Sequence, residues 1–136
     1  MNATTDEEAV LALADQFFAA IERGDIDAVR DFYAPDAVIW HNHDDVEQSR
    51  DENLRTLAWA VVHIDGMRYE EVRRSVTDTG FVQQHVVRGR NAVGVDVVMP
   101  ACLVVTVAAG LITRLDEYLD SRHVDVFAQL PPKAGA

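Results

Sequence analysis

The longest β-rich stretch of the chain, residues 67–118, decides its fold. Its sequence is MRYEEVRRSVTDTGFVQQHVVRGRNAVGVDVVMPACLVVTVAAGLITRLDEY. The β-branched and aromatic residues that favour strands are concentrated in four runs, 67–77, 81–89, 95–107 and 111–118. Turn-forming residues separate these runs at 78–80, 91–94 and 108–110. The stretch therefore predicts four strands connected as antiparallel hairpins.

The residues on either side predict helices and one further strand. Apolar residues recur at helical spacing over 10–32 on both sides of Gly24, which predicts two helices. Ala-Val-Ile-Trp-His at 37–41 predicts a strand, and helical spacing predicts a third helix over 46–64. A short last helix follows from Ser121. The order ααβαββββα, with helices segregated from a long sheet, predicts the α+β class.

The composition predicts one folded domain that binds neither nucleic acid nor membrane. The chain has 136 residues, 49% hydrophobic and 26% charged, a balance that supports a single core. Its 12 basic and 23 acidic residues give a net charge of -11, which repels phosphate backbones and anionic lipid headgroups. Cys102 is the single cysteine, which excludes an internal disulfide. The sequence also has no apolar segment typical of a signal peptide or membrane span, so we expect a cytoplasmic location.

Glu117 is the first candidate for chemistry, because alternation along the last predicted strand places it in one row with Leu115 and Leu119. A carboxylate among apolar side chains loses hydration, which suits it to general acid or base catalysis near neutral pH. The alternative is an exposed strand-end acid that pairs with an arginine such as Arg114 or Arg122.

His85 is the second candidate and lies within the predicted strand 81–89. A neutral imidazole can donate to, or accept from, a substrate oxygen or Glu117, and on neighbouring strands the two residues would form a proton relay. The alternative is a buried structural histidine that is satisfied by Gln83, Gln84 or a backbone carbonyl.

His41 and His43 fall on one face of the first predicted strand, with Asp44 and Asp45 close behind, a spacing that suggests metal ligands. No third ligand follows at a diagnostic spacing, and a polar loop at the strand end explains the run more simply. We therefore predict no metal site. Motifs for phosphate, dinucleotide or redox cofactors are also missing, so the sequence predicts chemistry without a cofactor.

A binding site for a small apolar molecule is expected on the concave side of the sheet, which a few helices cannot fill completely. The side chains that would line it are Tyr33, Trp40, Trp59, Val87 and Met99. Residues of these types at helical or strand spacing more often form ordinary core.

A family resemblance rests on the element order and on two segments, YAPDAVIWHN at 33–42 and GLITRLDEYLD at 110–120. They resemble the SnoaL-like and limonene epoxide hydrolase-like branches of the nuclear transport factor 2-like superfamily. The resemblance implies a cone-shaped, curved antiparallel sheet wrapped around helices, a cystatin-like roll. Residues 1–130 would form this single domain and 131–136 a flexible tail. It also implies a homodimer. One scaffold serves isomerases, cyclases, dehydratases, hydrolases and non-catalytic binding domains, so the resemblance predicts fold more closely than function.

The epoxide hydrolase branch implies one set of catalytic positions. Its members hold water with a tyrosine and an asparagine of the first strand and an acid of the last strand, which match Trp40, Asn42 and Glu117. The match is incomplete, because tryptophan replaces tyrosine and glutamate replaces aspartate. The branch's arginine–aspartate pair falls on His85 and Val87, so the pair that protonates the epoxide is missing.

The ketosteroid isomerases imply another position, because their acid at the end of the first strand falls on His41. Strand side chains alternate between faces, so either Trp40 with Asn42 or Ile39 with His41 faces the ligand. We favour Trp40 and Asn42.

SnoaL-like cyclases use an acid near the end of the chain as the base, which makes Asp120 a runner-up to Glu117. A helix cap in front of Ser121 also explains Asp120.

Two hypotheses follow. The first is a cofactor-free enzyme of the isomerase, cyclase, dehydratase or epoxide hydrolase type. It would transfer protons or add water on a small apolar, oxygen-bearing substrate with Glu117, His85 and Asn42. The second is a non-catalytic ligand-binding or dimerisation domain, in which outer sheet residues such as Val86 and Val104 would be buried against a second copy.

Overall fold

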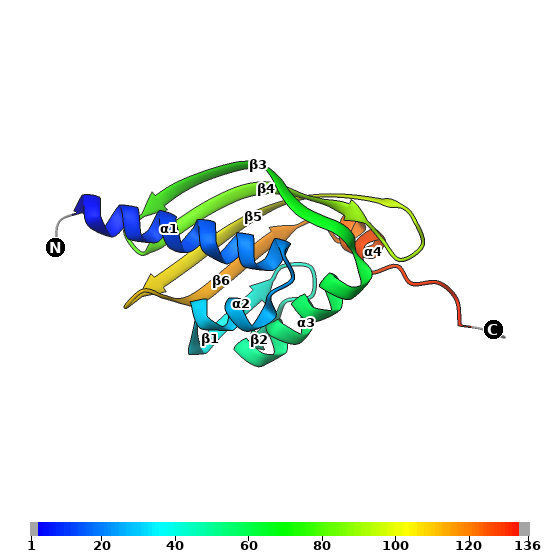
Figure 1. Cartoon of the computed structure of the whole chain (residues 1–136), viewed down its shortest axis with the longest axis horizontal. Coiled ribbons are helices and arrows are strands. Elements are labelled where there is room, and N and C mark those ends of the chain that lie inside the picture. Colours follow the sequence, from blue (N-terminus) through cyan, green and yellow to red (C-terminus); the bar gives the residue numbers. More distant parts are fainter. Residues whose placement is uncertain (1–2, 134–136) are drawn as a thin grey trace.

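The computed structural model describes residues 3–133. The helices are α1 (Ala3–Glu22), α2 (Ile26–Phe32), α3 (Arg50–His63) and α4 (Ser121–Phe127). The strands are β1 (Tyr33–His41), β2 (Val46–Ser49), β3 (Asp65–Thr77), β4 (Gly80–Arg90), β5 (Asp96–Ala108) and β6 (Leu111–Leu119). Of the predicted flexible tail, residues 131–133 form neither helix nor strand, and 134–136 lie outside the described residues. Figure 1 shows this arrangement, which confirms the predicted α+β class.

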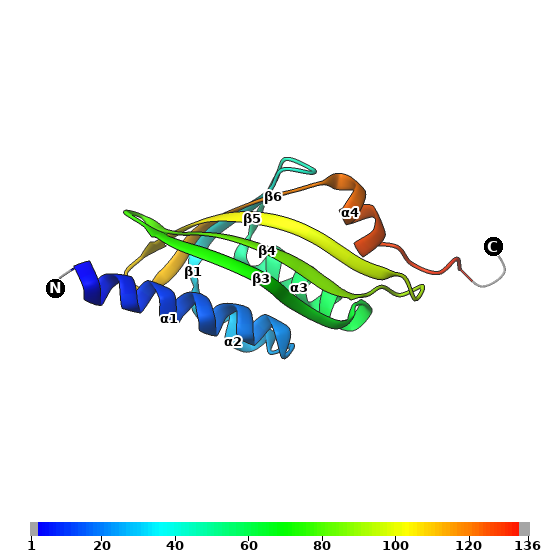
Figure 2. The same ribbon diagram turned by 90° about the horizontal axis from the view of Figure 1, so that it is seen from above.

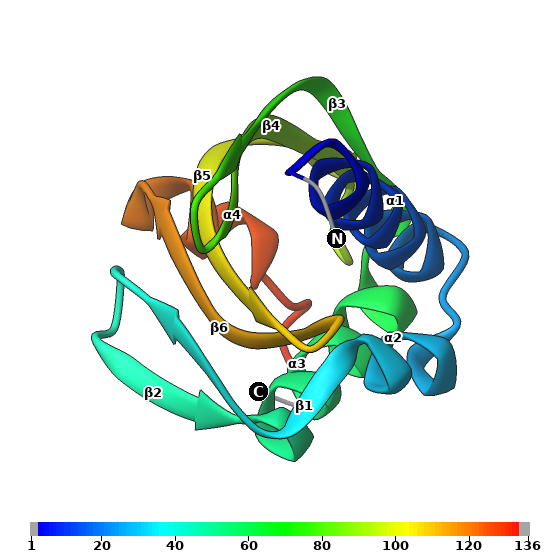
Figure 3. The same ribbon diagram turned by 90° about the vertical axis from the view of Figure 1, so that its left-hand side faces the viewer.

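The strands form one sheet of order β2-β1-β6-β5-β4-β3. Strands β3 to β6 are antiparallel neighbours, which confirms the predicted hairpins. The prediction was an antiparallel sheet. Strand β1 pairs with β6 in parallel, so the sheet is mixed. The sheet curls around α1 and α3 (Figure 3), and α1 and α2 lie together on one side of it (Figure 2).

The prediction of a helix over 46–64 is wrong at its start. Residues Val46–Ser49 form β2, which pairs antiparallel with β1, and α3 begins at Arg50. The Ser49 side chain accepts a hydrogen bond from the backbone N–H of Glu52, and the Glu52 carboxylate accepts one from the Ser49 N–H. This capping box satisfies two N–H groups at the helix end, which fixes the boundary between β2 and α3.

Two apolar clusters lie on the concave side of the sheet. The larger joins α1 and α2 to the sheet and includes the fully buried side chains of Phe17, Val29, Ile39, Phe81, Val105 and Ile112. The smaller joins the end of α3 to β4 and β5 and consists of Ala60, Ile64, Val87, Val97 and Met99. Met67, Tyr69 and Leu119 pack against both clusters, so these three residues mark the boundary between them.

Alternating burial in β4 brings polar groups onto the concave face. Phe81, Gln83, His85 and Val87 are buried, while Gln84 between them is exposed. Because side chains alternate between the faces of a strand, Gln83 and His85 share the face that the helices cover.

Candidate active site

The register of β1 decides which of its side chains face the helices. Ile39 lies opposite Leu115 of β6, and both side chains are almost fully buried in the larger cluster. Alternation then places His41 on the same concave face and Trp40 on the outer face. Our preference for Trp40 and Asn42 as the ligand-facing pair is therefore wrong.

Trp40 is held on the outer side by its own contacts. Its Nε1 donates to Asp45 Oδ1 at 2.7 Å, and its ring packs edge-to-face against exposed Tyr118 with centroids 5.3 Å apart. Asn42 is exposed beyond the end of β1, and its Oδ1 accepts from the Leu119 N–H at 2.9 Å. Both residues tie the strand ends together outside the concave face, so the structure does not support Asn42 as a catalytic residue or Trp40 as a ligand contact.

His41 and Glu117 form the most sheltered ion pair among the described residues. His41 Nε2 lies 3.0 Å from Glu117 Oε1, and the two side chains are 14% and 16% exposed. They lie opposite each other in the parallel β1–β6 pair, and Glu117 shares its face with buried Leu115. Arg114 pairs instead with Glu47 and Asp116, so it does not bind Glu117 as the alternative interpretation required.

The pKa of His41 reports this environment. Burial, the largest single effect, lowers the pKa, but the hydrogen bond to Glu117 and the charges of Glu117 and Asp44 together raise it above its ordinary value. The contact with Glu117 therefore shifts His41 towards its protonated form.

Glu117 is the charged neighbour that several buried groups share. Burial is the larger cause that raises the pKa of both Tyr33 and Tyr69, and the charge of Glu117 raises each further, so both hydroxyls stay protonated. The same charge also acts on His85. The charge of Glu117 thus acts on polar groups of β1, β3 and β4.

His85 is buried within a hydrogen-bonded chain that reaches α1. Its Nδ1 lies 2.8 Å from Gln83 Nε2, Gln83 Oε1 accepts from Arg74 Nε at 2.7 Å, and Arg74 Nη1 lies 2.6 Å from Asp15 Oδ1. Burial, the largest cause, and the Arg74 charge lower the pKa of His85 against the opposing charge of Glu117. Gln83 therefore satisfies one nitrogen of His85, as the alternative interpretation predicted.

The assumption that His85 and Glu117 lie on neighbouring strands is wrong. Strand β5 lies between them and contributes Ala101, opposite His85, and Leu103, opposite Glu117. Two strand spacings of about 4.8 Å, together with an offset of two residues along β5, separate their backbones by about 12 Å. No hydrogen bond joins the two side chains in the part of the chain that is described. A ligand that covers Ala101 and Leu103 would lie between them.

The residues predicted to line the ligand site lie in two places. Tyr33 is buried in the larger cluster, where its hydroxyl donates to Asn53 Oδ1 at 2.8 Å. Trp59 packs against the smaller cluster, which contains Val87 and Met99. Apart from Trp40, these side chains are on the concave side. Their role in binding a ligand stays a prediction.

Asp120 acts as a helix cap. Its side chain accepts from the Arg122 N–H at the start of α4 and pairs with the Arg122 guanidinium at 2.9 Å. These hydrogen bonds lower the pKa of Asp120 to about 2, so the group is a poor proton acceptor. Of the two acids, Glu117 is the one that shares its face with buried apolar side chains.

No group of three or more His, Cys, Asp or Glu side chains suited to hold a metal ion occurs within residues 3–133. His41 and His43, whose spacing suggested metal ligands, make separate contacts. His41 pairs with Glu117, and His43 Nε2 lies 3.6 Å from Asp44 Oδ2.

Two polar residues of the site, Arg74 and Asn53, were missed in the sequence. Gln83 and Arg74 form the series of hydrogen-bonded side chains that ends at His85. Asn53, on α3, accepts a hydrogen bond from the Tyr33 hydroxyl. Gln83 was identified from the sequence as a partner of a buried His85, and it shares a face with Phe81 and His85. Arg74 follows a register shift in β3 between Glu70 and Arg73, so no simple alternation predicts its face.

Comparison with known proteins identifies the family. Residues 14–115 match the SnoaL-like domain, and the chain belongs to this family. The fold is that of a candidate polyketide cyclase from Xanthomonas campestris pv. campestris, with a TM-score of 0.77, 21% identity, and coverage of 89% of this chain and 98% of that one. A protein with a ketosteroid isomerase-like fold from Catenulispora acidiphila, solved with trimethylamine, has a TM-score of 0.75, 14% identity and coverage of 88% and 93%. The cone-shaped fold of the nuclear transport factor 2-like superfamily is thereby confirmed.

A candidate hydroxylase from Streptomyces galilaeus is also similar, with a TM-score of 0.76, 16% identity, and coverage of 93% of this chain and 89% of that one. No curated protein sequence matches the chain. Among the described helices, none has both the length and the apolar character that crossing a membrane requires. The cytoplasmic location stays a prediction.

Proposed function

We propose that the protein is a cofactor-free acid–base catalyst that transfers a proton on a small, largely apolar, oxygen-bearing molecule, as isomerases and cyclases do. The observation that carries the proposal is the 3.0 Å contact between His41 Nε2 and Glu117 Oε1, with both side chains largely sheltered from solvent on the concave face. Glu117 is the proton acceptor. His41 orients it and balances its charge.

The surroundings of Glu117 favour proton transfer. Leu115 and Leu119 lie on its own strand, and Leu103 lies opposite it on β5. Apolar neighbours limit the access of water, which would otherwise compete with a substrate for the carboxylate. A carbon-bound proton next to a carbonyl group, placed over Leu103, would lie within reach of the carboxylate.

Proton transfer is favoured over epoxide hydrolysis. The positions that would hold the attacking water in the epoxide hydrolases match Trp40 and Asn42, and both lie away from the concave face. Glu117 and His41 therefore form an acid–base pair without the groups that would position water for this attack.

The test is the conversion of cyclohex-3-enone to cyclohex-2-enone, a proton transfer followed by ultraviolet absorbance. We expect the wild type to accelerate it and Glu117→Gln to reduce the acceleration by about 10² to 10⁴-fold, the range of general acid–base catalysis. The matched control is Glu47→Gln, the same change at an exposed carboxylate on β2. Equal loss in both variants, or no acceleration by the wild type, would contradict the proposal.

A second proposal is self-association through the outer face of the sheet, which a specific observation favours. Val72, Val98, Val104 and Tyr118 are each 42–46% exposed there, and a groove of about 720 Å³ crosses the face beside Val86 and Pro100. Exposed apolar patches of this kind mark interfaces, and a second copy of the chain would cover the patch symmetrically. Light scattering should show a dimer, and a monomer at micromolar concentration would contradict this proposal.

The two proposals are separable. A dimer that shows no catalysis in the cyclohexenone assay would favour the binding or dimerisation domain over the enzyme. Catalysis that is lost in Glu117→Gln, with the dimer retained, would favour the enzyme.

A further inference from the structure

One nitrogen of His85 has no hydrogen-bond partner. The residue is 3% exposed, and its Nε2 is buried without a donor or acceptor partner within residues 3–133. The ring is held edge-to-face by Tyr69 and Phe18, at centroid distances of 4.7 and 5.7 Å. Buried polar atoms in folded proteins nearly always have a partner, so an unpartnered one next to a candidate active site points to a ligand.

The residues behind His85 decide whether this nitrogen donates or accepts. Arg74 Nε carries only a donor, so the Gln83 atom 2.7 Å from it is the carbonyl Oε1. The Gln83 amide nitrogen therefore faces His85 Nδ1, 2.8 Å away, and it too can only donate. Nδ1 must accept, and the neutral ring carries its proton on Nε2.

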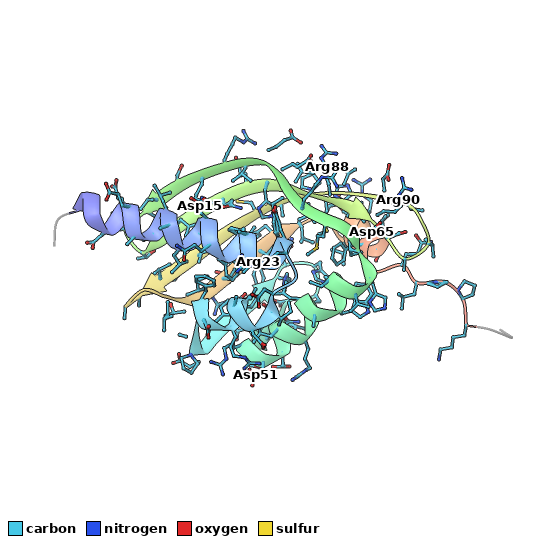
Figure 4. The ribbon with its side chains drawn as sticks, viewed as in Figure 1. Asp15, Arg23, Asp51, Asp65, Arg88 and Arg90 are labelled. Atoms are coloured by element: carbon cyan, nitrogen blue, oxygen red, sulfur yellow. The ribbon has the colours of Figure 1, made fainter. Side chains whose placement is uncertain are left out.

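The series of hydrogen-bonded side chains that ends at His85 begins on α1. Arg74 Nη1 lies 2.6 Å from the Asp15 carboxylate, and Asp15 is labelled on α1 in Figure 4. The Arg74 guanidinium also lies over the rings of Phe18 and Phe81, at 5.8 and 6.0 Å from their centroids. These contacts fix Arg74, and through it the orientation of the Gln83 amide.

A protonated His85 is disfavoured by the same geometry. An imidazolium would carry a proton on Nδ1, and this proton would face the N–H of the Gln83 amide. The ring is therefore a neutral donor, which can bind an oxygen without giving up its proton.

We infer that His85 Nε2–H is a binding site for an uncharged acceptor oxygen of the ligand, such as a ketone carbonyl, and that Gln83 and Arg74 are positioning residues that set its tautomer. The oxygen is uncharged because Glu117 shares this face and the chain carries a net charge of -11, which disfavour an anionic ligand. The inference rests on the proposed function in one respect, that the ligand occupies the concave face.

The tautomer is tested by ¹⁵N NMR of histidine-labelled protein at pH 7. We expect His85 to show a protonated Nε2 and an unprotonated Nδ1. In Gln83→Glu a carboxylate oxygen faces Nδ1, so Nδ1 should gain a proton. Gln84→Glu, the same change at the exposed neighbour, should leave the spectrum of His85 unchanged. A wild-type ring protonated on Nδ1 would overturn the inference.

The ligand class is tested with two probes of the same shape, cyclohexanone and methylenecyclohexane, which differ in the acceptor oxygen. Cyclohexanone should shift the His85 Nε2 signal, and methylenecyclohexane should not. His85→Phe, which removes the Nε2–H donor and keeps a ring of similar size, should weaken cyclohexanone binding about tenfold, the value of one hydrogen bond, and leave methylenecyclohexane binding unchanged. Equal effects on both probes, or no shift of the Nε2 signal at saturating cyclohexanone, would overturn the assignment.

These measurements do not depend on catalysis. Glu117→Gln should leave the His85 tautomer in place, so the acid–base proposal can fail while the binding site stands. A wrong tautomer with intact Glu117-dependent isomerisation would reject only the present inference.

Discussion

Replacement of Glu117 by glutamine should reverse the direction in which the pKa of His41 is shifted. In the wild type, the hydrogen bond and charge of Glu117, with Asp44, outweigh burial and raise the pKa. Glutamine keeps the shape but removes the charge, so burial, the largest single effect, should then dominate. We expect the pKa of His41 to change from above its ordinary value to below it.

The same variant should lose stability in a pH-dependent way. A raised histidine pKa stabilises the fold below the unfolded-state value of about 6.5, and this contribution is lost as pH rises through the folded-state pKa. Because both side chains are largely buried at a separation of 3.0 Å, we take the range for a charged hydrogen bond, about 1.5–3 kcal/mol. The stability difference between wild type and Glu117→Gln should approach this value near pH 6 and shrink towards pH 9.

The assays are NMR titration of His41 and urea denaturation at several pH values, with Glu47→Gln as the control. Glu47 pairs with Arg114 on the surface, so its loss should cost less than about 1 kcal/mol at any pH. An unchanged pKa of His41 in Glu117→Gln, or a stability loss that grows with pH, would refute the reasoning.

Three further predictions concern separate parts of the molecule. Tyr33→Phe leaves the buried Asn53 oxygen without its donor and should cost about 1–3 kcal/mol in urea denaturation, whereas Tyr118→Phe at an exposed position should cost little. Asp120→Ala removes the cap of α4 and should cost about 0.5–2 kcal/mol while isomerisation persists, and loss of isomerisation at unchanged stability would instead support Asp120 as the base. Val104→Glu should convert the dimer into a monomer in light scattering without unfolding it, and a persistent dimer would place the interface elsewhere.

Strand and hairpin positions could be predicted because alternation and turn residues are local signals. The runs over 81–89 and 95–107 became β4 and β5 with ends shifted by one residue. The start of α3 was missed because helical spacing was extended back through 46–49. The Ser49–Glu52 pair was a local signal for the correct start, since a serine three residues before a glutamate forms a capping box.

The site was harder to predict because it depends on which strands become neighbours. Glu117 was identified from its own strand, but its partner His41 depends on the parallel pairing of β1 with β6, which no local pattern specifies. The face of Trp40 depends on the same register. The hydrogen-bonded side chains that connect Asp15 to His85 come from α1, β3 and β4, so only the folded arrangement brings them together.

The most direct measurement of the central claim is deuterium uptake from D₂O at the carbon next to the carbonyl of cyclohexanone. This exchange isolates proton removal from every later step. We predict that the wild type accelerates uptake above the buffer rate, that Glu47→Gln matches it, and that Glu117→Gln falls back to the buffer rate. Uptake that is equally fast with Glu117→Gln would show that Glu117 is not the base.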